Sequence, residues 1–198
     1  MVAIINYKAG NIRSVVNALH RIGFEATLTA DPNEVSKASH VIFPGVGEAG
    51  SAMKDLQQSG MDEAIRSIRQ PFLGICLGMQ LLCESSEEQN TAALGLLPLQ
   101  VKRFPLGEKV PHMGWNCIQD GKFGNLPSHP LFKGIRSEDD FYFVHSYAAE
   151  IGAGTLTITD YLHPFSSAVE SDNFLGVQFH PEKSSEPGEK ILRNFLSL

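Results

Sequence analysis

The first third of the chain alternates short apolar runs with stretches in which apolar residues recur every three or four positions. Residues 1–6 are apolar and predict a strand, and the apolar positions within residues 12–22 share one face of a helix. Residues 24–29 predict a second strand. Asp31 and Pro32 then predict the start of a second helix, because Asp is a favoured N-cap and Pro fits the first helical turn.

The next apolar run, Val41-Ile42-Phe43, leads into a glycine-rich loop over residues 44–50. Helical periodicity follows to about residue 69, and residues 72–75 predict another apolar strand. The amphipathic segment 77–84 predicts a further helix. Strands that alternate with helices in this way form a parallel sheet covered by helices on both faces.

The pattern changes after about residue 96, where short strand-like runs are separated by Gly, Pro and Asn. The clearest of these runs are residues 141–145, 155–160, 166–170 and 174–179. They predict a partly antiparallel second half, and residues 188–197 predict a closing helix. We expect one α/β domain over residues 1–198, with a central, mostly parallel mixed sheet, helices on both faces and a partly antiparallel C-terminal half.

Composition narrows the possible functions. A formal net charge of −6 and the lack of any basic run argue against a nucleic-acid partner. No apolar run approaches the ~20 residues of a membrane helix, so we expect no membrane association. The three cysteines cannot all pair, and their spacing fits neither a disulfide framework nor a zinc site. Reduced thiols, no bound metal and a cytoplasmic location are the expectation.

One cysteine stands in the context of a nucleophile. Gly74-Ile75-Cys76-Leu77-Gly78 joins a predicted strand to a predicted helix, as in the strand-turn-helix elbow that exposes a catalytic side chain. The alternative is that Cys76 is a buried structural residue, since free cysteines are commonly core. Cys83 and Cys117 have no such glycines and are expected to be core residues.

One histidine stands in the context of a general base. His180 follows the predicted strand 174–179, and Glu182 lies two residues later, where its carboxylate could orient the imidazole. His112 and His145 lie in richer sequence contexts without such a carboxylate. The remaining histidines are expected to be structural, and they are His20, His40, His129 and His163.

The elbow at Cys76 and the run His180-Pro181-Glu182, in this chain order, resemble the class I glutamine amidotransferases, which use a Cys, His and Glu triad. Finer motifs resemble one branch of that family, the glutaminase subunits of imidazole glycerol phosphate synthases. These motifs are Gly10-Asn11, Pro44-Gly45-Val46-Gly47, the run 111–116, the run 142–147 and the run 180–184. The resemblance spans nearly the whole chain and implies the flavodoxin-like fold of the family.

The resemblance also implies roles for individual residues. The triad would be Cys76, His180 and Glu182, and backbone N–H groups of Val46, Gly47 and Leu77 would form an oxyanion hole. Gln80, Glu88, Ser146 and Tyr147 would bind L-glutamine, although the acidic run that contains Glu88 could instead be a solvated face. A cyclase subunit with a (β/α)₈ barrel would receive the ammonia in a heterodimer. Residues implied at that interface are Asn11, Trp115, Tyr142 and Lys183. No cofactor is implied.

Three alternatives remain open in the sequence. Residues 45–50 match the dinucleotide fingerprint G-x-G-x-x-G, but Arg69 and Gln70 stand where an acidic ribose ligand is expected. The chain could be the glutaminase of another amidotransferase, of the pyridoxal phosphate or aminobenzoate type. It could also be a non-catalytic regulatory partner with the same fold. The intact Cys76, His180 and Glu182 argue against the last of these.

Overall fold

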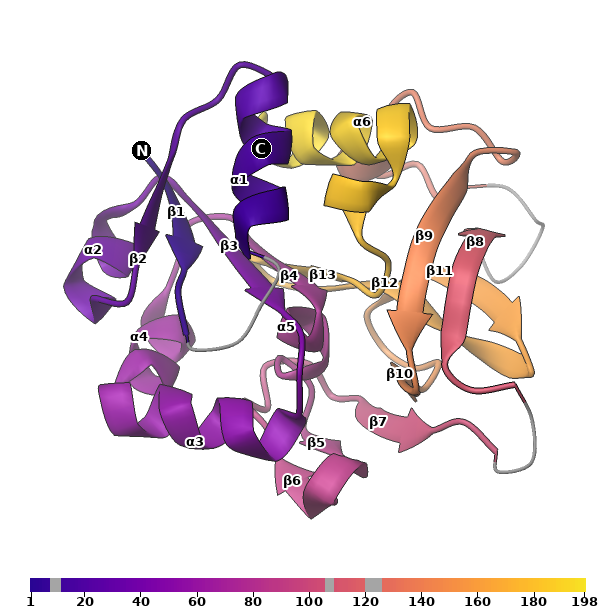
Figure 1. Cartoon of the computed structure of the whole chain (residues 1–198), viewed down its shortest axis with the longest axis horizontal. Coiled ribbons are helices and arrows are strands. Elements are labelled where there is room, and N and C mark those ends of the chain that lie inside the picture. The colour runs from indigo at the N-terminus through magenta and orange to yellow at the C-terminus, as the bar shows by residue number, and fades with distance from the viewer. Residues whose placement is uncertain (8–11, 106–108, 120–125) are drawn as a thin grey trace.

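The computed structural model describes residues 1–7, 12–105, 109–119 and 126–198. Its centre is a large mixed sheet with the strand order β2-β1-β3-β4-β13-β12-β10-β7-β5-β6, and β11 pairs with β12 off this path. A separate two-stranded sheet consists of β8 and β9. Figure 1 shows α1 and α6 on one side of the strands and α3 and α4 on the other. The predicted mixed sheet with helices on both faces is therefore confirmed.

The N-terminal half alternates strands and helices. Its elements are β1 (Val2–Ile5), α1 (Ile12–Arg21), β2 (Ala26–Thr29), α2 (Pro32–Lys37), β3 (His40–Gly45), α3 (Ala49–Ser59), α4 (Met61–Ser67) and β4 (Phe72–Cys76). β1 pairs in parallel with β2 and β3, and β3 pairs in parallel with β4. As predicted, the side chain of Asp31 caps α2 by accepting from the backbone N–H of Asn33, with Pro32 in the first turn.

The central strands β1, β3, β4 and β13 are buried on both faces because their alternate side chains enter two different cores. In β1, Ala3 and Ile5 belong to the core that packs against α2, α3 and α4. Val2 and Ile4 belong to the core that packs against α1 and α6. Successive side chains of a strand point to opposite faces, and both faces are covered in this central part of the sheet. Continuous apolar runs in the sequence are the consequence.

The C-terminal half adds shorter strands. Its elements are α5 (Leu77–Gln80), β5 (Ser85–Ser86), η1 (Glu88–Asn90), β6 (Thr91–Ala92), β7 (Gln100–Arg103), β8 (His112–Cys117), η2 (Pro130–Phe132), β9 (Asp140–His145), β10 (Tyr147–Ala149), β11 (Thr155–Tyr161), β12 (His163–Ser171), β13 (Phe174–Val177), η3 (Pro181–Lys183) and α6 (Ser185–Phe195). β13 returns to lie parallel to β4, whereas β10, β11 and β13 each pair antiparallel with β12. The predicted partly antiparallel half is confirmed.

The helix predicted over residues 77–84 is wrong in length and in character. α5 ends after one turn, at Gln80, and every residue from Leu77 to Cys83 is buried. The carbonyl groups of residues 81–83 accept hydrogen bonds from the backbone N–H groups of residues 94–97 instead of continuing the helix. A segment more than ten residues away therefore ends the helix, and no local pattern reports that.

Other differences are smaller. The helical stretch before β4 is divided at Gly60, whose φ of 69° ends α3. α6 begins at Ser185 rather than after Pro187, because a proline in the first helical turn loses no hydrogen bond. β13 ends at Val177, two residues before the predicted end of that strand. β8 was not predicted, because its residues show no clear alternation.

Candidate active site

Cys76 is the last residue of β4 and has a strained backbone, with φ 53° and ψ −110°. A positive φ is uncommon outside glycine and persists only where the surroundings hold it. Close packing explains the flanking glycines: a Cβ on Gly78 would overlap the carbonyl oxygen of Phe43, and a Cβ on Gly74 would lie 2.7 Å from the carbonyl oxygen of Gly78. The turn therefore requires glycine on both sides of the cysteine.

The loop after β3 lies beside this turn because Gly45 pairs with Cys76 across the parallel strands β3 and β4. Gly45 has close neighbours both at Tyr7 and at the turn that follows Cys76. A Cβ on Gly45 would overlap the hydroxyl of Tyr7 and would lie 2.7 Å from the backbone nitrogen of Gly78. The first glycine of the Pro-Gly-Val-Gly sequence is thus required by packing.

The structure brings Val46, Gly47 and Leu77 together with Cys76 around one cavity. Gly47 has a φ of 109°, a backbone conformation that favours glycine. Val46 stands between two glycines, which gives its peptide groups rotational freedom that most loop residues lack. Leu77 begins α5, so its backbone N–H has no partner within the helix. These are the three residues expected to supply oxyanion-binding N–H groups.

His180 and Glu182 form a buried pair just after β13, the strand next to β4. His180 Nδ1 lies 2.8 Å from Glu182 Oε1, and both side chains are almost fully buried. Because a carboxylate only accepts, Nδ1 carries the proton. The backbone N–H of His180 also donates to the carbonyl of Tyr142 in β9. Both contacts hold the ring in one orientation.

The pKa of His180 is raised to about 10. Burial of the ring acts to lower the pKa, but the charge of the neighbouring Cys76 and a hydrogen bond with it, together with the hydrogen bond and charge of Glu182, outweigh burial. Cys76 is therefore close enough to His180 to act on the ring through both charge and a side-chain hydrogen bond. An imidazolium beside a thiolate is the resting state of many cysteine nucleophiles.

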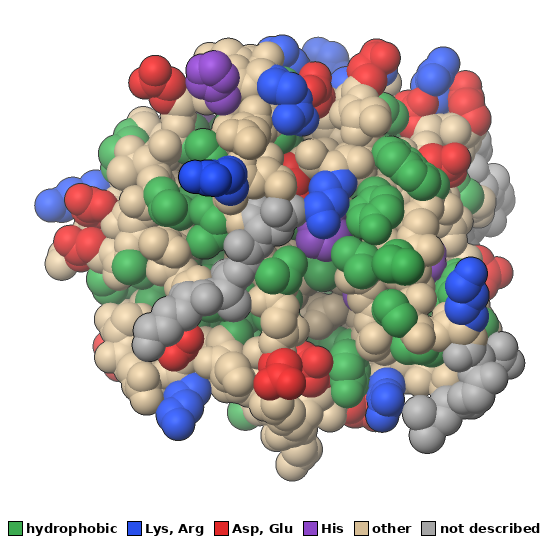
Figure 2. Space-filling view, in the orientation of Figure 1, with side chains coloured by type: hydrophobic (Ala, Val, Ile, Leu, Met, Phe, Trp, Pro, Cys, Tyr) green, Lys and Arg blue, Asp and Glu red, His purple; other side chains and the backbone are tan. Residues whose placement is uncertain are grey.

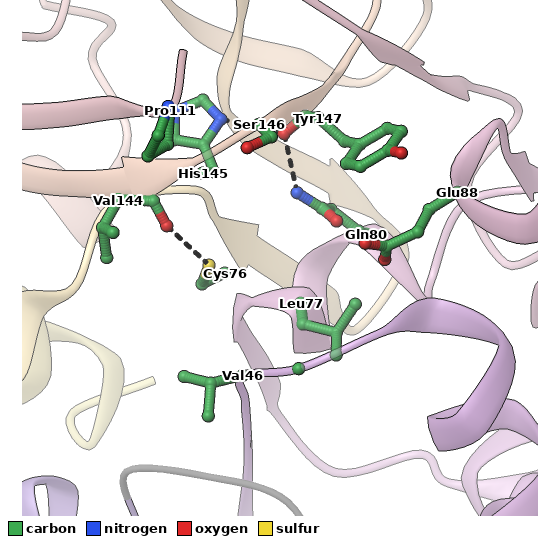
Figure 3. A pocket seen from close by; sticks show the side chains of 11 residues that line it. Val46, Cys76, Leu77, Gln80, Glu88, Pro111, Val144, His145, Ser146 and Tyr147 are labelled. Carbon is green, nitrogen blue, oxygen red and sulfur yellow. Dashed lines mark hydrogen bonds between the residues drawn. The ribbon is translucent and has the colours of Figure 1, made fainter.

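A cavity of about 380 Å³ opens next to Cys76. It is lined by Val46, Gly47, Cys76, Leu77, Gln80, Glu88, Pro111, Val144, His145, Ser146 and Tyr147. Figure 3 shows Gln80, Glu88 and Tyr147 gathered at one end, with the Cys76 sulfur directed toward the carbonyl group of Val144. The size is that of sites for small metabolites. All four residues expected to bind substrate therefore line the cavity that contains Cys76.

Gln80 lines this cavity, but its amide nitrogen is occupied by the protein. Nε2 of Gln80 donates to the carbonyl of Tyr147 at 2.8 Å and to Oε1 of Gln178 at 2.9 Å. The side chain is 4% exposed. Only its carbonyl oxygen is left to meet a ligand, which limits how Gln80 could take part in binding.

Glu88 is a half-buried residue of η1 rather than part of a solvated face. Its Oε2 accepts from the backbone N–H of Ala49 at 2.7 Å, at the start of α3. Burial raises the pKa of Glu88, the Ala49 N–H acts against that rise, and the charge of Glu48 adds to it. The carboxylate thus stands at the cavity with one oxygen held by a helix N-terminus.

Sequence reasoning missed a pair of buried histidines that supports the cavity wall. His145 Nδ1 lies 2.8 Å from the carbonyl oxygen of Tyr147, and His145 Nε2 lies 3.2 Å from Nδ1 of His112. His112 stacks on Tyr161 with ring centroids 3.9 Å apart. His112 and His145 are partners across β8 and β9. The sequence could have indicated this pair only if the pairing of these two strands had been predicted.

The residues expected at a partner interface lie on β8, β9 and η3, except Asn11, which is outside the described residues. Trp115 is 53% exposed and packs edge-on against Tyr142, with ring centroids 6.0 Å apart. The ammonium of Lys183 stands 5.6 Å from the centre of the Tyr142 ring. Met113 on β8 is also exposed. Figure 2 shows green hydrophobic side chains gathered with a blue cation over this side of the molecule.

The other two cysteines, Cys83 and Cys117, differ in how deeply they are buried. Cys83 is fully buried, as expected, and burial raises its pKa to about 12. The prediction that Cys117 is a core residue is wrong: it is half-buried at the end of β8. β8 belongs to a two-stranded sheet with one open side, so its outer positions reach solvent.

Two further features of the described residues concern metal binding and membrane insertion. Within residues 1–7, 12–105, 109–119 and 126–198, no cluster of three or more His, Cys, Asp or Glu side chains is arranged to hold a metal ion. None of the helices in the same part of the chain is long and apolar enough to span a membrane.

Comparison with known proteins places the chain among glutamine amidotransferases. The family model described as "Glutamine amidotransferase class-I" matches residues 3–198. The chain is 53% identical over 200 residues to "Imidazole glycerol phosphate synthase subunit HisH" of Bacteroides fragilis (strain YCH46), covering 100% of this chain and 99% of that protein. It is 45% identical over 208 residues to the protein of the same name from Dehalococcoides mccartyi (strain CBDB1), covering 100% and 97%.

Solved structures with low sequence identity share the fold. A crystal structure described as "glutamine amidotransferase" superposes with a TM-score of 0.76 at 22% identity, covering 100% of this chain and 98% of that one. The structure of PurLQS from Thermotoga maritima gives a TM-score of 0.72 at 18% identity, covering 99% and 97%.

Proposed function

Because this chain belongs to the class I glutamine amidotransferase family, we propose that it is the glutaminase subunit of an imidazole glycerol phosphate synthase, which hydrolyses L-glutamine to glutamate and ammonia. The observation that carries the proposal is full-length identity of 53% and 45% to two proteins of that name, joined to a cavity that holds Cys76. The pathway would be histidine biosynthesis.

The first half of the proposed reaction uses the thiolate of Cys76 and the imidazolium of His180. The Cys76 thiolate attacks the side-chain carbonyl carbon of glutamine and forms a C–S bond, while the carbonyl electrons move to oxygen. Backbone N–H groups of Leu77 and the Val46-Gly47 loop would stabilise this oxyanion. As the oxyanion collapses, the C–N bond breaks and the leaving nitrogen takes the proton of His180. Ammonia departs and a glutamyl thioester remains.

The second half restores the enzyme. Neutral His180 accepts a proton from water, and the oxygen of that water attacks the thioester carbonyl. The C–S bond then breaks, so the thiolate and the imidazolium are formed again and glutamate leaves. Glu182 would hold the Nδ1 proton throughout and stabilise the imidazolium, as the acid of a triad does.

Glutamine would lie with its amide at Cys76 and its amino-acid end toward Glu88. The carboxylate of Glu88 can accept from the α-amino group of an amino acid, and Ser146 and Tyr147 offer backbone and side-chain groups at the same end. The carbonyl oxygen of Gln80, which lies at the same end of the cavity as Glu88, would also face the amino-acid end of the substrate. No cofactor is part of this mechanism.

The ammonia would pass to a cyclase subunit with a (β/α)₈ barrel, in a heterodimer. The exposed aromatic and cationic surface formed by Trp115, Tyr142 and Lys183 supports this placement of the interface, because exposed Trp, Tyr and cations are enriched at binding sites. Asn11, outside the described residues, is proposed there by resemblance alone. A cytoplasmic location is proposed because the three cysteines are free.

The test replaces Cys76 by serine in the reconstituted complex with a cyclase subunit. Glutamine-dependent synthesis should fall by at least ~10³-fold, because a serine hydroxyl is not ionised as a thiol can be. Synthesis from added ammonium salt should persist, because the cyclase does not use the thiol. Cys117→Ser, the same substitution outside the cavity, is the matched control and should retain both activities. Loss of both activities in Cys76→Ser would mean that Cys76 has a structural role.

Glutaminases of the pyridoxal phosphate or aminobenzoate type are the second candidate, and no observation favours them. A non-catalytic partner with this fold would have no use for the buried His180–Glu182 pair beside Cys76. Measured glutaminase activity of the wild-type complex separates a catalytic from a non-catalytic role, and activity with the acceptor of imidazole glycerol phosphate formation separates the glutaminase types.

A further inference from the structure

Gln178 is a fully buried polar residue that the mechanism above does not use. It follows β13, whose parallel register pairs Val177 with Ile75, so the next residue of each strand is Gln178 beside Cys76. Nε2 of Gln178 lies 3.5 Å from the sulfur of Cys76. The sheet itself thus places an amide next to the nucleophile.

The orientation of this amide follows from a chain of hydrogen bonds. The carbonyl oxygen of Tyr147 can only accept, so the group of Gln80 that faces it at 2.8 Å must be the NH₂ group. The second hydrogen of that NH₂ group points to Gln178 at 2.9 Å, so Gln178 must present its carbonyl oxygen there. The NH₂ group of Gln178 is then left to face Cys76, where it donates to the sulfur.

We propose that Gln178 is a further catalytic residue, whose amide N–H stabilises the thiolate form of Cys76. Sulfur accepts hydrogen bonds weakly as a thiol and much better as a thiolate, because bonds to a charged acceptor are the strong ones. A donor held in place by the rest of the protein therefore favours the ionised nucleophile before any substrate arrives.

The other neighbours of the sulfur explain why such a donor is needed. The carbonyl oxygen of Val144 lies 3.9 Å from the sulfur, where it accepts from a thiol S–H and repels a thiolate. Among the described titratable groups, His180 and Tyr7 interact with Cys76; the charge of a His180 imidazolium favours a neighbouring thiolate, whereas Tyr7 is buried and neutral. Gln178 therefore adds to His180 in opposing the effect of Val144.

The same series of hydrogen bonds gives Gln80 a second role. Its NH₂ group is used to hold the carbonyl oxygen of Gln178, so Gln80 fixes the direction of the donor that reaches Cys76. In this respect Gln80 is a positioning residue for the nucleophile as well as a wall of the cavity. Substitutions of Gln80 should therefore alter the ionisation of the Cys76 thiol even in the absence of glutamine.

The experiment measures the rate at which iodoacetamide alkylates Cys76 as a function of pH, followed by mass spectrometry of the peptide that contains it, without glutamine. In Gln178→Leu the rate at pH 7 should fall by about 10- to 100-fold, the range expected for losing one hydrogen bond to a charged group. At high pH the rate should equal or exceed that of the wild type, because the thiol is then ionised in both proteins. A disturbed cavity would lower the rate at every pH.

Gln178→Glu provides a second variant of nearly equal size, which decides the test if Gln178→Leu does not fold. One carboxylate oxygen can keep the bond from Gln80, and the other would face the sulfur and repel the thiolate, so alkylation at pH 7 should again slow. Asn173→Leu is the matched control: it removes a side-chain amide at the opposite end of β13, with its bonds to the carbonyls of Ile68 and Gln70, and should leave the pH dependence unchanged.

This inference rests on the proposed role of Cys76 as nucleophile, but its test does not use glutaminase activity. An alkylation profile of Gln178→Leu or Gln178→Glu that matches the wild type would overturn it, and so would an equal shift in Asn173→Leu. If the profiles shift as expected while the wild-type complex has no glutaminase activity, the proposed function fails and the role of Gln178 stands.

Discussion

At the scale of single residues, the chemistry of the site depends on which ring nitrogen of His180 carries a proton. Glu182 accepts from Nδ1 of His180, and burial of both leaves this bond undisturbed by water. The histidine can then exchange a proton only through Nε2, on the side of Cys76. One carboxylate thereby determines both the tautomer and the direction of proton transfer.

Glu182→Gln should keep the fold and lower kcat of the reconstituted complex by roughly 10²-fold, at the low end of what positioned acid–base catalysis contributes. An amide can still contact the ring, but it does not carry the negative charge that stabilises an imidazolium. Steady-state kinetics with glutamine would measure the loss. Glu186→Gln, the same change on the exposed first turn of α6, is the control. An unchanged kcat in Glu182→Gln would remove this residue from the mechanism.

At the scale of elements, the turn between β4 and α5 is held by direct contact with β3. The site for a Cβ on Gly78 is occupied by the backbone carbonyl group of Phe43, and backbone cannot move aside as a flexible side chain can. The positive φ of Cys76 is therefore maintained by packing from a neighbouring strand.

Gly78→Ala should lower the free energy of unfolding by about 3 kcal/mol or more, because overpacking against backbone forces strands to separate. Gly50→Ala is the matched control, since its Cβ would meet the flexible end of the Gln89 side chain and Ala favours α3. Its effect should stay within ~1 kcal/mol. Urea unfolding of the isolated chain measures both. Similar midpoints for the two variants would show that the turn can relax.

The pairing of β8 with β9 creates the neutral histidine pair. Tyr147 supplies only a carbonyl acceptor, so His145 must be protonated on Nδ1 and must accept at Nε2 from Nδ1 of His112. Burial lowers the pKa of His145 to about 3 and that of His112 to about 4. Protonation of His145 would remove the acceptor at Nε2 and break the pair.

The stability of the protein should therefore fall as pH decreases from about 6.5 toward 4. The folded-state pKa values of His112 and His145 lie below the ordinary value of 6.5, so in this window the unfolded chain binds more protons than the folded one. Urea midpoints at pH 7 and pH 5 would show the difference. His145→Gln can keep the bond to Tyr147 and cannot titrate, so its midpoints should differ less between the two pH values.

His20→Gln is the control for this comparison, because His20 lies exposed on α1. It should keep the full pH dependence of the wild type. An equal pH dependence in His145→Gln would mean that other groups cause the acid sensitivity.

At the scale of the whole molecule, the exposed surface of β8 and β9 is hydrogen-bonded to the segment that carries His180. Tyr142, which contacts Trp115 and Lys183 on the outside, also accepts the backbone N–H of His180 on the inside. Its own backbone N–H donates to Ser184, whose hydroxyl donates to the carbonyl of His180. A partner bound on this surface would therefore contact the segment that holds His180.

Trp115→Ala should weaken binding of the cyclase subunit by roughly 30-fold, as expected for truncation of an aromatic residue at an interface that costs ~2 kcal/mol. The stability of the isolated chain should hardly change, because Trp115 is exposed in it. Calorimetric titration with the cyclase measures the affinity, and glutaminase kcat at saturating cyclase measures any coupling. Ile151→Ala, at another exposed apolar position, is the control. Undiminished affinity in Trp115→Ala would place the interface elsewhere.

The sequence by itself determined the order of strands and helices in the first half, because apolar periodicity and caps act over a few residues. The sequence also indicated which motifs follow strands: Cys76 ends β4, and the His180-Pro181-Glu182 run begins three residues after Val177, the last residue of β13. Gln178 could have been noticed, since period two puts it on the same face as His180, with Val177 and Phe179 on the other.

Only the tertiary structure decided what depends on distant segments. Residues 94–97 end α5 by using the carbonyls of residues 81–83, and no pattern within residues 77–84 contains that information. The register of β13 against β4 puts Gln178 beside Cys76, and the pairing of β8 with β9 puts His112 beside His145. Each of these contacts joins residues far apart in sequence, so it exists only after the sheet has formed and its buried polar groups have found partners.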